Sequence, residues 1–220
     1  MTFPELRDRC RRRSDYILTA IVINELSLFL TWIFCKTSIT PNQVTLLSLA
    51  CGLLSGIFYA FGFFCSGSFF LFIAHTLDCT DGNLARAKQQ FSQLGKWLDM
   101  VVDRFSQTFV FLGVAFYFLS AGAHALWLFL SLCDAVLLTV YYYSVDIALA
   151  YGLSKPVQTF SQLTLKGVHI KWGLLEPVIY GFVILAPIGL LKLHIVLVLI
   201  SVSAGLIIQC VKMTMLLGKR

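Results

Sequence analysis

Six long apolar runs follow one another between residues 43 and 216, and short polar or Gly-rich turns separate most of them. Most of these runs have at least the roughly 20 residues that a helix needs to cross a bilayer. The pattern therefore predicts an all-α integral membrane protein with six transmembrane helices. The expected spans are about 43–62, 67–88, 95–119, 124–150, 172–190 and 194–216, with one long connection over residues 151–171.

A further apolar stretch, residues 17–35, follows a segment that is rich in arginine, residues 1–13. This stretch either crosses the bilayer or lies in the membrane interface. A weak polar stripe favours an amphipathic helix in the interface, with the arginines on anionic headgroups. We expect residues 1–41 to form this N-terminal region and residues 42–220 to form the transmembrane domain. The stripe consists of Ala20, Asn24, Ser27 and Thr31.

Composition agrees with a membrane protein, because 58% of the 220 residues are hydrophobic and only 13% are charged. With six spans, nearly all lysines and arginines fall on one side, and Lys192 falls on the other. This bias predicts that both termini face the cytosol, in a bacterial inner membrane or the endoplasmic reticulum. It also favours an interfacial helix over a seventh span, since a seventh span would move the N-terminal arginines across. The net charge of +6 is explained by this belt, and we expect no nucleic-acid partner.

Four aspartates and one arginine interrupt the second and third apolar runs, between Asp78 and Asp103. On a helix, residues 78, 81, 82, 85 and 86 are spaced i, i+3, i+4, i+7 and i+8 and therefore share one face. Residues 95, 99 and 103 share one face of the next helix in the same way. Both faces are expected at the cytosolic ends of their spans.

Charge is costly in such surroundings. An aspartate or arginine at a membrane centre costs about 2.5–3.5 kcal/mol, and less near the interface. Two carboxylates about 5 Å apart repel by roughly 3 kcal/mol at an effective dielectric near 20. A divalent cation relieves this repulsion, and carboxylate oxygens suit Mg²⁺, Mn²⁺ and Ca²⁺. The alternative, four solvated acids near helix ends, is disfavoured by the fixed spacing of glycine and arginine among them. We predict a metal site with the ligands Asp78, Asp81, Asp99 and Asp103.

The complete pattern resembles the motif of the CDP-alcohol phosphatidyltransferase family. It reads Asp78-x2-Asp81-Gly82-x2-Ala85-Arg86-x8-Gly95-x3-Asp99-x3-Asp103, and every fixed position is present. The resemblance extends to the opening Pro41-Asn42-x-Val44-Thr45 and to the six-helix plan. It implies a membrane transferase that displaces CMP from a CDP-alcohol by a second alcohol, and it also implies a homodimer.

The roles implied by this resemblance agree with the chemistry of the residues. The acids would hold Mg²⁺ or Mn²⁺, as a pair of ions, and Asp103 would be the general base for the acceptor alcohol. Arg86 can bind phosphate oxygens with its forked guanidinium, and the alternative role for it is an ordinary positive anchor on the cytosolic side. The remaining expected contacts to the nucleotide and its pyrophosphate are Asp78, Gly82, Ala85 and Gly95, the last three because they leave room for a close approach.

Weaker expectations concern the residues around the motif. Lys155, Lys166 and Lys171 either bind a phosphate on the acceptor or are ordinary inside-positive charge, and Lys171 should lie at the mouth of the fifth span. His75 is expected to be a hydrogen-bonded neighbour of Asp78. Helical geometry should turn Cys79 about 100° away from Asp78. Asn42 and Thr45 either face the nucleotide or cap a helix, and capping is favoured, with Asn42 as the expected cap.

The donor and the acceptor remain open at this point. CDP-diacylglycerol with a polar acceptor is favoured, and transfer of a CDP-linked headgroup to a lipid or to inositol phosphate is the alternative. A cation or proton transporter would also explain acids in a membrane, but it needs them near the midplane, often with broken helices or a repeat. A non-catalytic protein that keeps the fold would have no need of Asp103.

Overall fold

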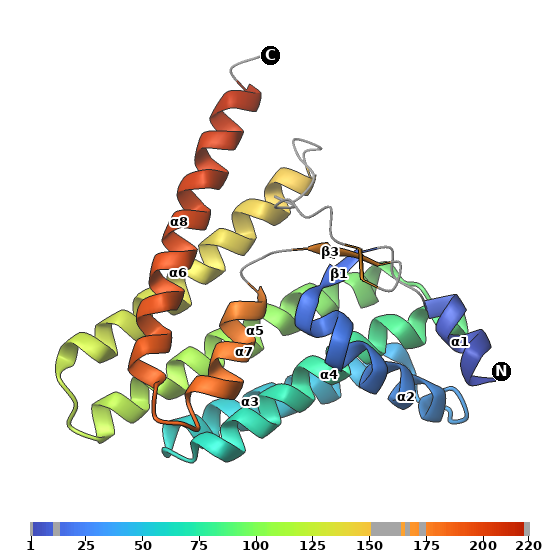
Figure 1. Ribbon diagram of the computed structural model, residues 1–220, viewed down its shortest axis with the longest axis horizontal. Coiled ribbons are helices and arrows are strands. Elements are labelled where there is room, and N and C mark those ends of the chain that lie inside the picture. The colour runs from blue at the N-terminus through green and yellow to red at the C-terminus, as the bar shows by residue number, and fades with distance from the viewer. Residues whose placement is uncertain (1, 11–13, 151–163, 166–167, 172–174, 218–220) are drawn as a thin grey trace.

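The computed structural model describes residues 2–10, 14–150, 164–165, 168–171 and 175–217 and is predominantly helical (Figure 1). A short π-helix, η1 (Thr19–Ile23), runs directly into α2. The α-helices are α1 (Phe3–Cys10), α2 (Asn24–Phe34), α3 (Pro41–Ala60), α4 (Phe64–Lys88), α5 (Gln93–Ser120), α6 (Ala125–Ala150), α7 (Leu175–Leu185) and α8 (Leu191–Leu217).

The six predicted apolar runs correspond to α3–α8. Four helices are long and apolar enough to cross a membrane: α3, α5, α6 over Ala125–Ala148, and α8. Helix α4 has 25 residues but carries the polar motif in its second half. The 11 described residues of α7 extend about 16 Å, little more than half of a bilayer core. The chain is therefore an integral membrane protein with four candidate spans among the described residues, and the count of six stays a prediction.

Local sequence explains where the helices around the motif begin and end. Thr40 caps α3 through a capping box with Gln43, and Pro41 occupies the first turn, where a missing N–H costs nothing. The expectation that Asn42 is the cap was wrong by two residues. The Ser92 hydroxyl caps α5 by accepting from the backbone N–H of Gly95 at 2.8 Å. Helix α4 ends at Gln89, which adopts the left-handed conformation with φ of 56°.

A small sheet, which the sequence analysis did not predict, joins the N-terminal region to the connection before α7. Strand β1 (Ser14–Tyr16) pairs in parallel with β3 (Val168–Lys171), and β2 (Thr164–Leu165) pairs antiparallel with β3. Lys171 therefore lies in a strand opposite Tyr16 and not at the mouth of a helix. The alternation in this part of the chain is too short to be distinguished from a loop.

The N-terminal region packs with its polar stripe inward. Ser27 and Thr31 are fully buried, and the helix packs against α4. The exposed positions of η1 and α2 are apolar, with Ile21 and Phe29 each about half exposed. The 16 helical residues, 19–34, are fewer than the roughly 20 that a straight span needs. The interfacial location stays a prediction, and two of the four residues of the stripe, Ser27 and Thr31, are buried within the protein.

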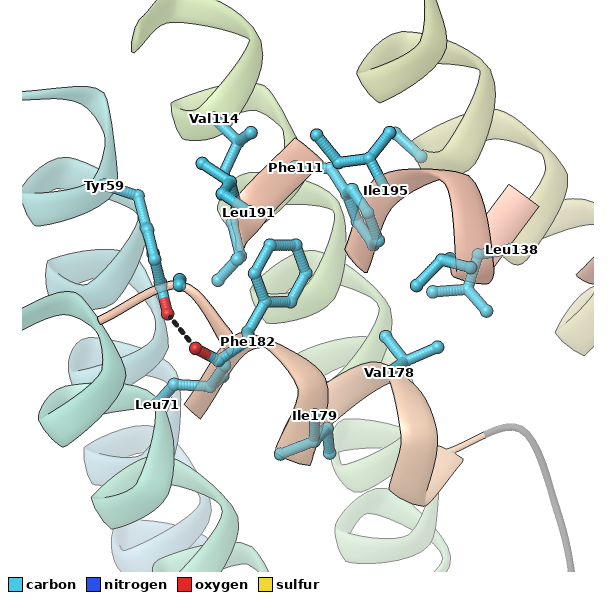
Figure 2. Close-up of a cluster of buried hydrophobic side chains, with 14 of the residues drawn as sticks. Tyr59, Leu71, Phe111, Val114, Leu138, Val178, Ile179, Phe182, Leu191 and Ile195 are labelled. Carbon is cyan, nitrogen blue, oxygen red and sulfur yellow. Dashed lines mark hydrogen bonds between the residues drawn. The ribbon is translucent and has the colours of Figure 1, made fainter. Parts of the chain in front are cut away.

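The main core lies at the end of the bundle away from the motif, between α3, α5, α6, α7 and α8 (Figure 2). Phe111 and Phe182 meet there with ring centres 5.0 Å apart. The Tyr59 hydroxyl donates to the Phe182 carbonyl at 3.0 Å, which ties α3 to α7. Figure 1 shows α6 and α8 side by side, and their contacts extend this core.

Helices α3 and α5 approach closely enough to need glycine. A Cβ atom on Gly113 would lie 2.1 Å from the carbonyl oxygen of Gly56, and one on Gly56 would lie 2.7 Å from the carbonyl oxygen of Phe109. Close backbone contact through small residues is typical of helix pairs in membranes. This contact fixes the position of α5, and with it the second half of the motif.

Candidate metal centre and its cavity

Three of the four predicted acids meet in space. Asp78 and Asp81 lie one turn apart on α4, and Asp99 comes from the second turn of α5. Their carboxylate oxygens lie within 4.8 Å of one another. Helix α3 packs against both α4 and α5 and so brings the two halves of the motif together. A cluster of hard oxygen donors at this spacing fits a divalent cation such as Mg²⁺ or Mn²⁺.

Helix α3 also contributes directly to the acid cluster through Thr45. The Thr45 hydroxyl donates to Oδ2 of Asp81 at 2.5 Å, and both side chains are buried. Hydrogen bonds of this kind fix the orientation of a metal-ligating carboxylate. The sequence favoured a capping role for Thr45, with a nucleotide contact as the alternative, and nothing in the local pattern indicates its partner 36 residues away.

Asp103 lies beside this cluster, two turns along α5 from Gly95. It is a close neighbour of Asp78, whereas the three mutually close acids do not include it. The next residue, Arg104, stacks over the ring of Tyr142 with 4.0 Å between guanidinium and ring centre, and forms an ion pair with Asp146 at 3.6 Å. Asp103 is thus placed where it can receive a proton or complete the coordination of an ion.

A cavity of about 540 Å³ opens beside the acids, where α3 begins, α4 ends and α5 begins. Asp81 and Asp99 line it, and so do four of the five residues expected to contact a nucleotide and its pyrophosphate. Asp78, the fifth, lies behind them and does not line the cavity. The four are Gly82, Ala85, Arg86 and Gly95.

Two helix N-termini meet at this cavity, those of α3 and α5, and the first residues of both helices line it. The positive ends of helix dipoles and their free backbone N–H groups favour a bound anion. Gly95 permits the close approach, since a Cβ atom there would lie 2.9 Å from Oδ1 of Asn42 and from the Ser92 hydroxyl. In the structure, the missing side chain of Gly95 leaves room for Asn42 of the neighbouring helix α3. Room for a nucleotide at the same place stays a prediction.

Arg86 is oriented by a residue that the sequence analysis missed. Its Nη2 donates to Oδ1 of Asn83 at 2.6 Å, and Nδ2 of Asn83 donates to the Ser27 hydroxyl of α2 at 2.9 Å. Asn83 is fully buried. It occupies a variable position of the family motif, so only the structure reveals its contacts.

His75 lies on the same helix face one turn before Asp78, as expected. One of its ring nitrogens, a carboxylate oxygen of Asp78 and the Cys79 sulfur lie within 4.8 Å of one another. The Cys79 sulfur thus lies near the Asp78 carboxylate, and the expected rotation of about 100° between the two side chains stays a prediction. Nε2 of His75 lies 3.4 Å from the Thr19 hydroxyl of η1, which in turn lies 3.5 Å from the Tyr180 hydroxyl of α7.

None of the three lysines expected to bind the acceptor lines the described cavity. Lys155 and Lys166 lie outside the described residues, and Lys171 lies in β3. Another lysine, Lys96, was counted only as inside-positive charge but lines the cavity at the start of α5. Its position next to Gly95 in the motif is the only sequence signal for it.

A model of the CDP-alcohol phosphatidyltransferase family matches residues 38–192, most of the chain. The chain belongs to this family. Among curated relatives, the phosphatidylinositol phosphate synthase of Cutibacterium acnes is 33% identical over 93 residues, which are 42% of this chain and 45% of the relative. The archaetidylinositol phosphate synthase of Pyrococcus horikoshii is 37% identical over 78 residues, 35% of this chain and 41% of the relative. The chain thus aligns with less than half the length of either CDP-alcohol phosphatidyltransferase relative.

Solved structures of Mycobacterium tuberculosis phosphatidylinositol phosphate synthase share the fold. The form with bound CDP-DAG superposes with a TM-score of 0.70 at 18% identity, covering 86% of this chain and 94% of that one. The form with manganese and citrate superposes with a TM-score of 0.68, also at 18% identity, covering 85% and 88%. At this identity the likeness concerns the fold of the CDP-alcohol phosphatidyltransferases and not the substrate.

Proposed function

We propose that this protein transfers a phosphatidyl group from CDP-diacylglycerol to a polar alcohol and releases CMP. The observation that carries this proposal is the cluster of Asp78, Asp81 and Asp99 beside a cavity that Arg86 also lines. The arrangement offers ligands for cations, a cationic fork for phosphate and space for a nucleotide. The CDP-DAG in the Mycobacterium tuberculosis structure supports a CDP-linked donor of this kind.

The acid cluster would hold two divalent ions, Mg²⁺ or Mn²⁺, in line with the manganese in the second neighbour structure. When bound, such ions neutralise the diphosphate and stabilise the oxygen of the leaving CMP. Thr45 keeps the carboxylate of Asp81 oriented, and Asp103 completes the set as a neighbour of Asp78. Hard oxygen ligands without sulfur at the cavity wall favour these metals over zinc.

The chain itself would bind the donor and move one proton. Arg86 contacts the diphosphate, and Gly82, Ala85 and Gly95 leave room for the nucleotide. The acceptor oxygen forms a bond to the phosphatidyl phosphorus while the bond from that phosphorus to CMP breaks. The acceptor proton passes to Asp103, and CMP leaves with the bonding electrons.

For the acceptor, an inositol phosphate is favoured because the relatives in Cutibacterium and Pyrococcus are both named as inositol phosphate lipid synthases. Lys155, Lys166 and Lys171 are then the candidates for binding the acceptor phosphate, together with Lys96 at the cavity. The alternative is transfer of a CDP-linked headgroup to a lipid or to inositol phosphate. Both reactions use the same acid cluster.

The protein would work as a homodimer in a bacterial inner membrane or the endoplasmic reticulum, with the cavity facing the cytosol. The charge distribution of the sequence supports this orientation. Residues 17–35 would lie in the interface, and their exposed apolar side chains, including Ile21 and Phe29, would contact lipid.

Release of CMP from purified protein tests the proposal. The protein is supplied with Mn²⁺ or Mg²⁺, CDP-diacylglycerol and, in turn, inositol 1-phosphate, inositol, glycerol 3-phosphate and serine. We expect CMP release that requires one acceptor, and loss of release with a chelator or with Asp103→Asn. Asp134→Asn is the matched control, because Asp134 is a fully buried aspartate of α6 outside the acid cluster.

The outcomes separate the alternatives. Release that survives Asp103→Asn removes Asp103 as the base and leaves the metal site in place. If CDP-diacylglycerol gives no CMP release with any acceptor, the assay is repeated with CDP-inositol, CDP-choline and CDP-ethanolamine as donors. Absence of CMP release with every donor would refute the proposed transferase and favour a transporter or a non-catalytic protein.

A further inference from the structure

Asn83 lies between the N-terminal helix and the arginine of the motif, and nothing in the motif itself gives it a role. We infer that Asn83 is a positioning residue that holds Arg86 ready for the donor diphosphate, and that Ser27 of α2 holds Asn83 in turn. The inference rests on the proposed function, because it assigns a role in the same donor site.

Both the oxygen and the nitrogen of the Asn83 amide form hydrogen bonds, and the chemistry of the two partners determines which atom faces which partner. A guanidinium can only donate, so the amide oxygen must face Arg86. The observed contact is Nη2 of Arg86 to Oδ1 of Asn83 at 2.6 Å. The amide nitrogen then donates to Oγ of Ser27 at 2.9 Å. Since Asn83 has no exposed surface, no water can replace either bond without a change in packing.

Ser27 is itself anchored on α2. Its hydroxyl donates to the carbonyl of Asn24 at 3.1 Å, which leaves its oxygen lone pairs for Asn83. The side chain of Ser27 is fully buried against α4. A continuous chain of hydrogen bonds therefore runs from the backbone of α2 to the guanidinium at the cavity wall.

The contact matters because an arginine side chain is long and has many rotamers. Fixing one guanidinium nitrogen before the donor arrives removes part of the ordering cost of binding. Asn83 does this without charge, so the bond itself does not neutralise the guanidinium. A carboxylate at the same position would also hold the arginine, but it would compete with the phosphate for it. The structure therefore favours an amide over an acid at residue 83.

Steady-state kinetics of CMP release provide the first test, once the wild-type protein is active. Asn83→Ala should raise the KM for CDP-diacylglycerol at least about tenfold, the lower end of the value of one hydrogen bond to a charged group. The KM for the acceptor and the apparent affinity for Mn²⁺ should not change. Asn83→Asp should raise the donor KM further than Asn83→Ala does. Ser27→Ala should raise it by a smaller factor, because Asn83 keeps its bond to Arg86.

A double-mutant cycle separates a role through Arg86 from a general packing role. In an Arg86→Ala background, Asn83→Ala should cause no further rise in the donor KM. Thr76→Val is the matched control. It removes another buried hydroxyl from α4, whose bond goes to the carbonyl of Phe72 in the same helix. This control should leave the donor KM unchanged.

Three results would overturn the inference. The first is an equal rise in the donor KM from Asn83→Ala with and without Arg86. The second is a donor KM that no variant at residue 83 changes. The third is a donor KM that is lower with Asn83→Asp than with Asn83→Ala. If Asn83→Ala fails to fold, Ser27→Ala and Asn83→Asp carry the test. Equilibrium binding of CDP in the presence of Mn²⁺ keeps the two proposals apart. Binding that depends on Asn83 in a protein that releases no CMP refutes the transferase and supports the inference.

Discussion

Replacing Thr45 with valine removes one hydrogen bond from the acid cluster and nearly preserves the shape of a buried side chain. The hydroxyl donates to Oδ2 of Asp81 at 2.5 Å, and Thr45 is only 3% exposed. Without this donor the Asp81 carboxylate loses its fixed orientation toward Asp78 and Asp99. We therefore expect Thr45→Val to weaken metal binding more than it weakens the fold.

The magnitude follows from the type of bond. A hydrogen bond to a charged group is worth about 1.5–3 kcal/mol, which corresponds to roughly 10- to 150-fold in an equilibrium constant. Removal of a partner that orients a metal ligand typically costs about 10- to 100-fold in metal affinity. We expect the Mn²⁺ concentration for half-maximal CMP release to rise by about 10- to 100-fold, within the range of both estimates.

The assay is a Mn²⁺ titration of CMP release at saturating donor and acceptor, and the control is Ser48→Ala. Ser48 also lies on α3, is 4% exposed and donates across to α4, but its acceptor is the backbone carbonyl of Ala74 at 2.9 Å. An unchanged Mn²⁺ requirement for Thr45→Val would refute the reasoning. Equal shifts for the two variants would show that any loss of an α3–α4 bond has this effect.

Three further predictions concern the acid cluster and the packing around it. Asp99→Asn should reduce CMP release at least about 100-fold at any Mn²⁺ concentration, because it removes a proposed ligand; near-normal release at high Mn²⁺ would contradict a ligand role. Gly113→Ala should destabilise the protein by about 1–3 kcal/mol through the clash with the carbonyl of Gly56, and a thermal melt with no decrease in Tm would contradict the close α3–α5 contact. Leu6→Ala should cost about 2–5 kcal/mol because Leu6 of α1 is fully buried in a cluster with Leu28 and Ala87. A melt that matches the wild type would show that α1 does not pack there.

The acid cluster could be predicted from the sequence because its geometry is mostly local. Asp78 and Asp81 lie one helical turn apart, and so do Asp99 and Asp103 on the next helix. The spacing alone therefore places the acids of each helix on one face. That α4 and α5 turn these faces toward each other depends on α3, whose glycine contact with α5 has no signature in the spacing of the acids. Thr45 and Asn83 could not be assigned for the same reason, since their partners are set by tertiary packing.

In the N-terminal region the polar stripe was recognised from the sequence, but its partners could not be identified from the sequence alone. A polar stripe on an otherwise apolar helix indicates that one face meets polar groups, and it does not say whether those groups are water, headgroups or protein. In the structure Ser27 meets Asn83 and Thr19 approaches His75. The small sheet also depends on partners remote in sequence, because β1 pairs with β3 after more than 150 intervening residues.

Two of the contacts that join the N-terminal region to α4 span the same sequence distance. Thr19 reaches His75 and Ser27 reaches Asn83, each 56 residues later. During synthesis η1 and α2 therefore precede these partners by about 3 to 11 s at 5–20 residues per second. Over that interval the Ser27 hydroxyl can bond to the Asn24 carbonyl of its own helix, but the bond from Asn83 cannot yet form. Docking becomes possible once α4 has emerged, so the order of biogenesis places the completion of the donor site after the insertion of α3.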